Sequence, residues 1–139
     1  MTDPLGVRNR NPANIVAGPV TWQGQTGVNG RFCVFDTPKD GIRALAKNLL
    51  AYQDNHGLNT VRRIINRWAP PVENNTSAYV SAVSGDMAVD PDATINLHIP
   101  ATLISLCAAI IRHENGEQPY GQAVLSAAVA DALDGNVQT

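Results

Sequence analysis

Glu114 is the side chain in this 139-residue chain whose position best suits acid chemistry. Leu103, Cys107 and Ile110 precede it by 11, 7 and 4 positions, and these spacings place all four side chains on one face of an α-helix. Burial on that apolar face and the negative end of the helix dipole both favour the protonated carboxylic acid. Such an acid can give its proton to the leaving oxygen of a breaking C–O bond. We therefore expect Glu114 to act as a general acid/base.

The alternative for Glu114 is a solvent-exposed glutamate at a frayed helix end, paired with Arg112 or His113. Tyr79 is the side chain most suited to assist it, because its hydroxyl can hydrogen-bond either the glutamate or a sugar acetamide. Tyr79 also shares a helical face with Val83, four residues later, which is the pattern of a core tyrosine. The sequence leaves both roles open.

Several polar and aromatic residues are candidates for the rest of a site. Glu73 is either a second site carboxylate or a solvated carboxylate at a helix start, where the dipole favours it. Asn11, Asn14 and Trp22 suit substrate binding, because amides bind hydroxyl and acetamide groups and indole faces stack on sugar rings. Turn formation explains the two asparagines, and a small local core explains the tryptophan, equally well. We expect Trp68 to fill the core at the end of a helix.

Other catalytic chemistries have little support. Cys33 and Cys107 each lie in an apolar run, which is typical of buried thiols and not of a reactive nucleophile. Whether the two cysteines pair stays open. His56, His98 and His113 show no paired ligand spacing such as His-x-x-x-His. We expect no metal and no cofactor.

The composition excludes two classes of partner. A net charge of −2 with scattered basic residues gives no basic surface for nucleic acid. No apolar stretch approaches the roughly 18 residues of a membrane span, so we expect no membrane partner. The N-terminal residues lack the features of a signal peptide, which predicts synthesis as a cytoplasmic product without a leader.

The elements that must position these residues are mostly helices. Residues 1–30 are rich in glycine, proline and asparagine and should be extended segments and turns, too polar for a helix. A short strand is expected at 31–36, and Thr37 is the expected N-cap of the next helix, with Pro38 after it and Asp36 and Asp40 serving the cap. The expected helices are 37–56, 60–68, 76–85, 99–114 and 121–133, with a connection at 85–98. The sequence predicts one mainly α domain over 1–139 with a small β element.

Three segments resemble lysozyme-like enzymes. Residues 114–116, Glu-Asn-Gly, look like the Glu-Ser-Gly helix end of lytic transglycosylases and flagellar-type glucosaminidases. Residues 73–80 resemble the Glu-Thr-x-x-Tyr-Val element of lytic transglycosylases, whose tyrosine lies beside the catalytic glutamate. The segment that follows the catalytic helix in the glucosaminidases is similar, in order and spacing, to residues 9–15, 22–24, 32–37 and 41–46.

The whole chain also resembles a group of small phage virion proteins. Their pattern is Gly-Val-Arg-Asn-x-Asn-Pro near the start, here residues 6–12, and His-Glu-Asn-Gly near the end, here residues 113–116. Many of them are described only as structural proteins. In ordinary lysozyme-like enzymes the glutamate helix comes first, whereas here it comes last. The resemblance therefore implies a circularly permuted α+β lysozyme-like fold.

The resemblance implies an activity and a partner as well. It implies cleavage of the glycan strands of bacterial peptidoglycan by a lytic transglycosylase or muramidase, with Glu114, Tyr79 and Glu73 as catalytic candidates. A single strong carboxylate favours the transglycosylase, because hydrolysis needs a partner that activates water. The resemblance also implies a phage-encoded protein that is virion-associated or released to the periplasmic wall, with other virion proteins as further partners. The alternative is a virion structural or peptidoglycan-binding protein that keeps the fold without activity.

Overall fold

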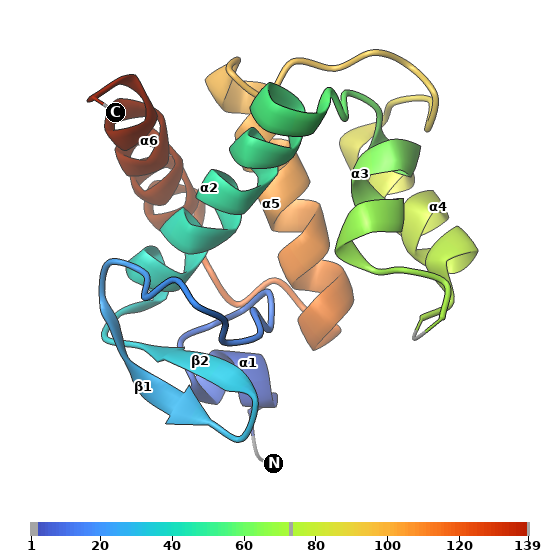
Figure 1. Cartoon of the computed structure of the whole chain (residues 1–139). Coiled ribbons are helices and arrows are strands. Elements are labelled where there is room, and N and C mark those ends of the chain that lie inside the picture. The colour runs from blue at the N-terminus through green and yellow to red at the C-terminus, as the bar shows by residue number, and fades with distance from the viewer. Residues whose placement is uncertain (1–2, 73, 139) are drawn as a thin grey trace.

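A computed structural model describes residues 3–72 and 74–138 of the chain. Within these ranges the chain forms six helices and one two-stranded sheet (Figure 1). The elements are, in chain order, α1 (Leu5–Arg8), β1 (Gln25–Asn29), β2 (Phe32–Phe35), α2 (Pro38–His56), α3 (Val61–Trp68), α4 (Thr76–Met87), α5 (Pro100–Asn115) and α6 (Gln122–Gln138). The prediction of a mainly helical fold with a small β element is confirmed.

The longest helix, α2, begins and ends where its capping residues require. The Thr37 side chain accepts a hydrogen bond from the Asp40 backbone N–H at 3.2 Å, and Pro38 occupies the first turn. Gly57 ends the helix in the left-handed conformation, with φ of 65°. These are the cap residues that the sequence predicts, and they fix both ends of α2.

Three element boundaries differ from the prediction. Residues 1–30 were expected to contain no helix, but Pro4 accepts backbone hydrogen bonds from Val7 and Arg8 and closes the single turn of α1. Helix α4 continues beyond residue 85 to Met87, where Ala88 takes the left-handed conformation. Helix α6 does not end near residue 133 but runs to Gln138, since one glycine within a helix costs only about 1 kcal/mol.

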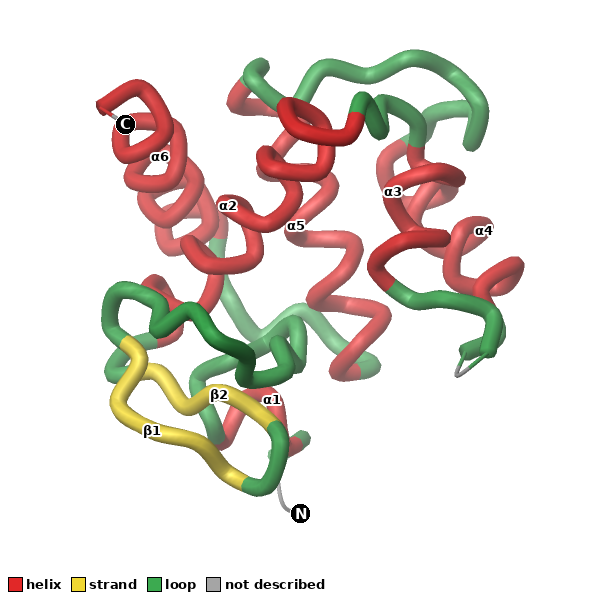
Figure 2. The backbone as a smooth tube through the Cα atoms, in the orientation of Figure 1, coloured by secondary structure: helices red, strands yellow, loops and turns green. Residues whose placement is uncertain are grey.

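The strands form an antiparallel hairpin onto which the N-terminal segment folds. Asn29 pairs with Phe32 across the turn, where Gly30 has φ of 61°. Val16 forms an isolated bridge with Phe32, and the Cys33 backbone N–H donates to the carbonyl oxygen of residue 15 at 3.0 Å. Figure 2 shows the sheet and the surrounding loops gathered at one end of the molecule, away from α3 and α4. The segment before β1 is therefore held against β2 by backbone hydrogen bonds.

Helix α5 carries the central part of the core. It packs against α2, α4 and α6, and its inward face, which includes Leu103, Leu106 and Ile110, is fully buried. The buried residues of the hairpin and of the other long helices join the same hydrophobic cluster. Because its apolar face is enclosed, α5 is a rigid support for the residues at its C-terminal end. Among the helices described, none is long and apolar enough to cross a membrane.

Candidate active site

Glu114 lies in the last turn of α5, half-buried, and both of its carboxylate oxygens accept hydrogen bonds. Tyr79 Oη donates to Oε2 at 2.8 Å, and Asn14 Nδ2 donates to Oε1 at 2.9 Å. Arg112 pairs instead with Asp86 at 3.2 Å, and the His113 ring stacks on Tyr79. The two donors come from distant parts of the chain, the N-terminal loop and α4, and they meet at Glu114.

Tyr79 keeps its proton in this position. Its side chain is 2% exposed, and burial, together with the charge and hydrogen bond of Glu114, raises its pKa far above the usual value. A hydrogen bond from Trp68 acts weakly in the opposite direction. The ring of His113 stacks on Tyr79 with a centroid distance of 3.8 Å and an interplanar angle of 29°. Tyr79 is thus a fixed hydroxyl donor to Glu114 and also a core residue, so the two roles suggested by the sequence coexist.

The structure gives the two asparagines of the N-terminal loop different roles. Asn11 is fully buried, and its amide donates to the carbonyl oxygens of Ile15 and Cys33 and accepts from the Ile15 backbone N–H. All of these bonds lie inside the protein, so the expectation that Asn11 binds substrate is corrected: it folds the loop. Asn14 has φ of 55°, a conformation that asparagine tolerates, and its side chain reaches Glu114. Asn14 therefore contacts the carboxylate while it also lines the adjacent cleft.

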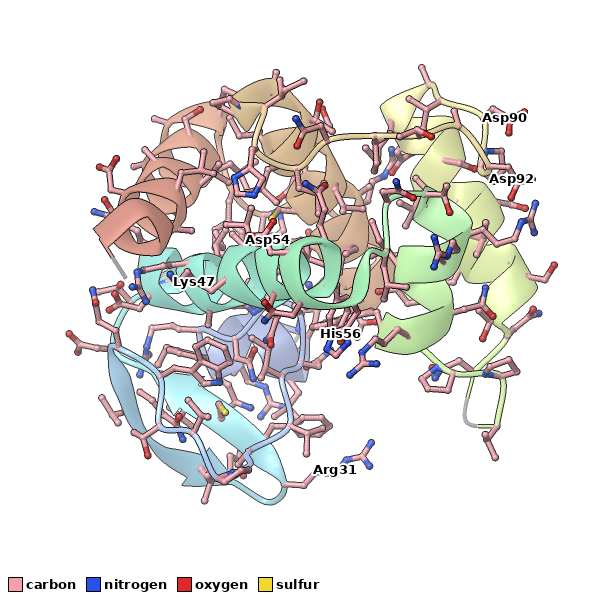
Figure 3. The ribbon with its side chains drawn as sticks, turned by 45° about the horizontal axis from the view of Figure 1, so that its top comes forward. Arg31, Lys47, Asp54, His56, Asp90 and Asp92 are labelled. Atoms are coloured by element: carbon pink, nitrogen blue, oxygen red, sulfur yellow. The ribbon has the colours of Figure 1, made fainter. Side chains whose placement is uncertain are left out.

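A cleft of about 710 Å³ lies over Glu114. Its lining comes from α1, the segment before the hairpin, the hairpin turn, α2, the end of α3 with the loop after it, and the end of α5. Its lining residues include Asn14, Trp22, Arg31, Phe32, Asn48, Tyr52, Trp68, Asn74 and Glu114. Arg31 extends outward from the turn between the two strands, with its guanidinium 5.0 Å from the Phe32 ring centroid (Figure 3). The cleft combines aromatic rings with amides, which suits a sugar polymer.

The aromatic walls include residues that sequence reasoning did not assign to a site. Trp22 lines the cleft and also packs against the core. Trp68 was expected only to fill the core, but it also lines the cleft, beside Tyr52 at a ring distance of 6.5 Å. Asn48 of α2 also faces the cleft. The spacing within α2 gives no functional signal at Tyr52 or Asn48, because the cleft forms only where other elements lie against this helix.

Glu114 is the only acidic residue among the described residues that line the cleft. Glu73, the second candidate carboxylate, lies outside the described residues. Asp40 accepts a hydrogen bond from the Thr37 hydroxyl at 3.0 Å and has the capping role that the sequence predicts. Within residues 3–72 and 74–138, no three His, Cys, Asp or Glu side chains are grouped as a metal site would require.

Both cysteines are unpaired and buried. Burial raises the pKa of the Cys107 thiol far above its usual value, and it raises that of Cys33 as well. A buried thiol with a raised pKa is a poor nucleophile. The cysteines therefore belong to the core and leave Glu114 and its partners as the candidate chemistry.

Comparison with known proteins gives one informative relative. No known sequence family profile matches the chain. The chain is 36% identical over 120 residues to a protein of Pseudoalteromonas phage PM2 named Protein P5. The match covers 83% of this chain and 73% of that protein. It therefore includes most of the elements that surround the cleft.

Proposed function

The chain belongs to the same family as Protein P5 of Pseudoalteromonas phage PM2, and we propose that it cleaves the glycan strands of bacterial peptidoglycan. The observation that supports this most strongly is the single half-buried carboxylate of Glu114, bonded by Tyr79 and Asn14 below a cleft with aromatic walls. The resemblance of the Glu-Asn-Gly segment to lytic transglycosylases points the same way. The similarity to a phage protein also agrees with this activity, since a phage must breach the cell wall of its host.

In the proposed reaction, Glu114 acts first as an acid and then as a base. Protonated Glu114 gives its proton to the glycosidic oxygen while the bond from that oxygen to C1 breaks. The 6-hydroxyl of the same muramoyl sugar then attacks C1, and Glu114 takes up the hydroxyl proton. The product is a 1,6-anhydro sugar, and the carboxyl group ends in its starting form. This route needs one carboxylate, which is the number found among the described cleft residues.

Tyr79 and Asn14 suit the two protonation states of such a carboxyl group. Asn14 Nδ2 can only donate, so its partner oxygen Oε1 remains the acceptor. The Tyr79 hydroxyl can donate to an ionised Oε2 or accept from a protonated one. We therefore place the transferable proton on Oε2. The cleft aromatic rings, Trp22 and Trp68 among them, stack on sugar rings, and Asn48 and Asn74 bind hydroxyl and acetamide groups.

Release of soluble fragments from purified peptidoglycan tests the proposal. Glu114→Gln keeps the size of the side chain and removes the proton donor, so we expect activity to fall by about 100- to 10,000-fold, the range typical of acid/base residues. Glu117→Gln is the matched control, because Glu117 is exposed beyond the end of α5 and outside the cleft lining. If the wild-type protein binds peptidoglycan but releases nothing across a range of pH and salt, it is a non-catalytic virion or wall-binding protein.

The proposed place of action follows from the phage relationship and not from the cleft. We propose that the protein reaches the periplasmic wall either as part of a virion or after release at lysis. Mass spectrometry of purified particles distinguishes these routes. Stoichiometric copies in the particle indicate delivery with the virion, and their absence indicates release.

A further inference from the structure

The hydrogen bond between Asn14 and Glu114 depends on how the N-terminal loop, residues 11–14, is held against the end of α5. These two residues are 100 positions apart in the chain. The loop keeps its own shape through a bond from the Asn14 backbone N–H to the Asn11 carbonyl oxygen at 2.9 Å. This bond shapes the loop but does not fix its distance from the helix. Other contacts must therefore set the position of Asn14 relative to Glu114.

Asn115 joins the loop to the helix. Its Nδ2 donates to the Pro12 carbonyl oxygen of the loop at 2.7 Å and to the Ile111 carbonyl oxygen of α5 at 2.8 Å. The side chain is 9% exposed, so water competes little for these bonds. One amide group thus bridges the loop and the helix immediately beside Glu114.

Gly6 of α1 packs closely against both the loop and Asn115. A Cβ atom at this position would lie 2.9 Å from the Asn11 carbonyl oxygen and 3.0 Å from Oδ1 of both Asn14 and Asn115. The first contact is closer than real Cβ atoms show and involves backbone, and the other two would require the asparagine side chains to shift by a few tenths of an ångström. Oδ1 of Asn115 has no hydrogen-bond donor among the described residues. The absence of a side chain at Gly6 leaves room for the three oxygens to converge.

We propose that Gly6 and Asn115 are positioning residues that hold the Asn14 amide against Glu114. Asn115 draws the loop toward α5 through Pro12, and Gly6 leaves room for the Asn14 side chain to turn toward the carboxylate. Neither residue needs to touch substrate. The effect on catalysis rests on the proposed function, whereas the effect on the position of Asn14 does not.

The first test is Gly6→Ala, compared with Gly85→Ala as a matched control. Both glycines lie in helices, but a Cβ at Gly85 would meet nothing within 4 Å. We expect Gly6→Ala to lower kcat by about 10- to 100-fold with little change in KM, because displacement by about 1 Å costs this much. Gly85→Ala should keep the wild-type kcat.

The second readout is independent of activity. The side-chain NH₂ signals of Asn14 are identified in an NMR spectrum by their absence in Asn14→Gly, which suits the positive φ at this position. We expect these signals to shift in Gly6→Ala and in Asn115→Ala and to stay in place in Gly85→Ala. Asn115→Ala also serves if Gly6→Ala fails to fold.

A double-mutant comparison separates positioning from general damage. In the Asn14→Gly background, adding Gly6→Ala should change kcat by no more than about twofold, since both changes then act on the same contact. Unmoved Asn14 signals in Gly6→Ala would overturn the proposal, and so would full additivity. If wild-type protein cleaves nothing, the proposed function fails while the NMR comparison still decides how Asn14 is held.

Discussion

Glu114 receives hydrogen bonds from two donors that differ in what they can do. Tyr79 presents a hydroxyl that donates or accepts, whereas Asn14 presents an amide N–H that only donates. The apolar spacing of α5 correctly predicted the face on which Glu114 lies. It could not predict that the last turn emerges at a cleft, which leaves Glu114 half-buried. Periodicity describes one helix, but a cleft depends on the neighbours of that helix.

Tyr79→Phe tests the hydroxyl alone. The ring keeps its place in the core, but Oε2 of Glu114 loses its donor, so we expect kcat to fall about 10-fold, the equivalent of one hydrogen bond of roughly 1.4 kcal/mol. The control is Tyr120→Phe, because the Tyr120 hydroxyl is buried with no partner among the described residues. Cleavage rates with defined glycan fragments measure both variants. Equal rates for Tyr79→Phe and wild type would mean that this hydroxyl is only structural.

At the scale of elements, capping signals were predictable and some boundaries were not. Thr37, Pro38 and Gly57 define α2 because each acts through its own backbone geometry. The single turn of α1 carries no such signal, and it forms because the chain around it packs against α5. Its contribution to the site through Gly6 was therefore invisible in the sequence.

Gly41→Ala tests how the N-terminal loop docks onto α2. Gly41 is buried in the first turns of the helix, and a Cβ there would overlap the Arg10 carbonyl oxygen. Arg10 also donates to the Phe35 carbonyl oxygen at 2.7 Å, so the loop cannot simply move away. We expect the free energy of unfolding to fall by roughly 1–3 kcal/mol, measured by urea denaturation. An unchanged midpoint would show that the loop is not tightly docked on α2.

On the scale of the whole molecule, the site joins segments that are far apart in the chain. Asn14 comes from the N-terminal loop, Tyr79 from α4 and Glu114 from the end of α5. Spacing rules work within one element and cannot bring these three together. The resemblance to lytic transglycosylases predicted only that Tyr79 lies beside Glu114, and it did not predict the contact of Asn14. Tyr52 and Asn48 were not predicted to line the cleft, because the segments that resemble lysozyme-like enzymes do not include them.

The raised pKa of Tyr79 also affects the stability of the molecule at high pH. The folded protein keeps this proton, whereas in the unfolded chain the hydroxyl ionises with an ordinary pKa of about 10. Stability from this group is therefore fully present below about pH 10 and is lost as the pH rises above it. Between about pH 10.5 and 11.5 we expect wild type to lose roughly 1 kcal/mol more than Tyr79→Phe. Parallel pH profiles of the unfolding free energy in the two proteins would contradict this.

The most direct test of the account is mass spectrometry of the sugar ends produced from purified peptidoglycan by wild type and by Glu114→Gln. The proposed reaction predicts fragments with 1,6-anhydro ends from wild type and none from the variant, because the Glu114 carboxyl group both donates the proton to the glycosidic oxygen and accepts the proton of the 6-hydroxyl. Reducing ends from wild type would contradict the transglycosylase route and indicate hydrolysis. Equal yields of fragments from both proteins, or no glycan fragments from wild type, would contradict the assignment of Glu114 as the acid and base.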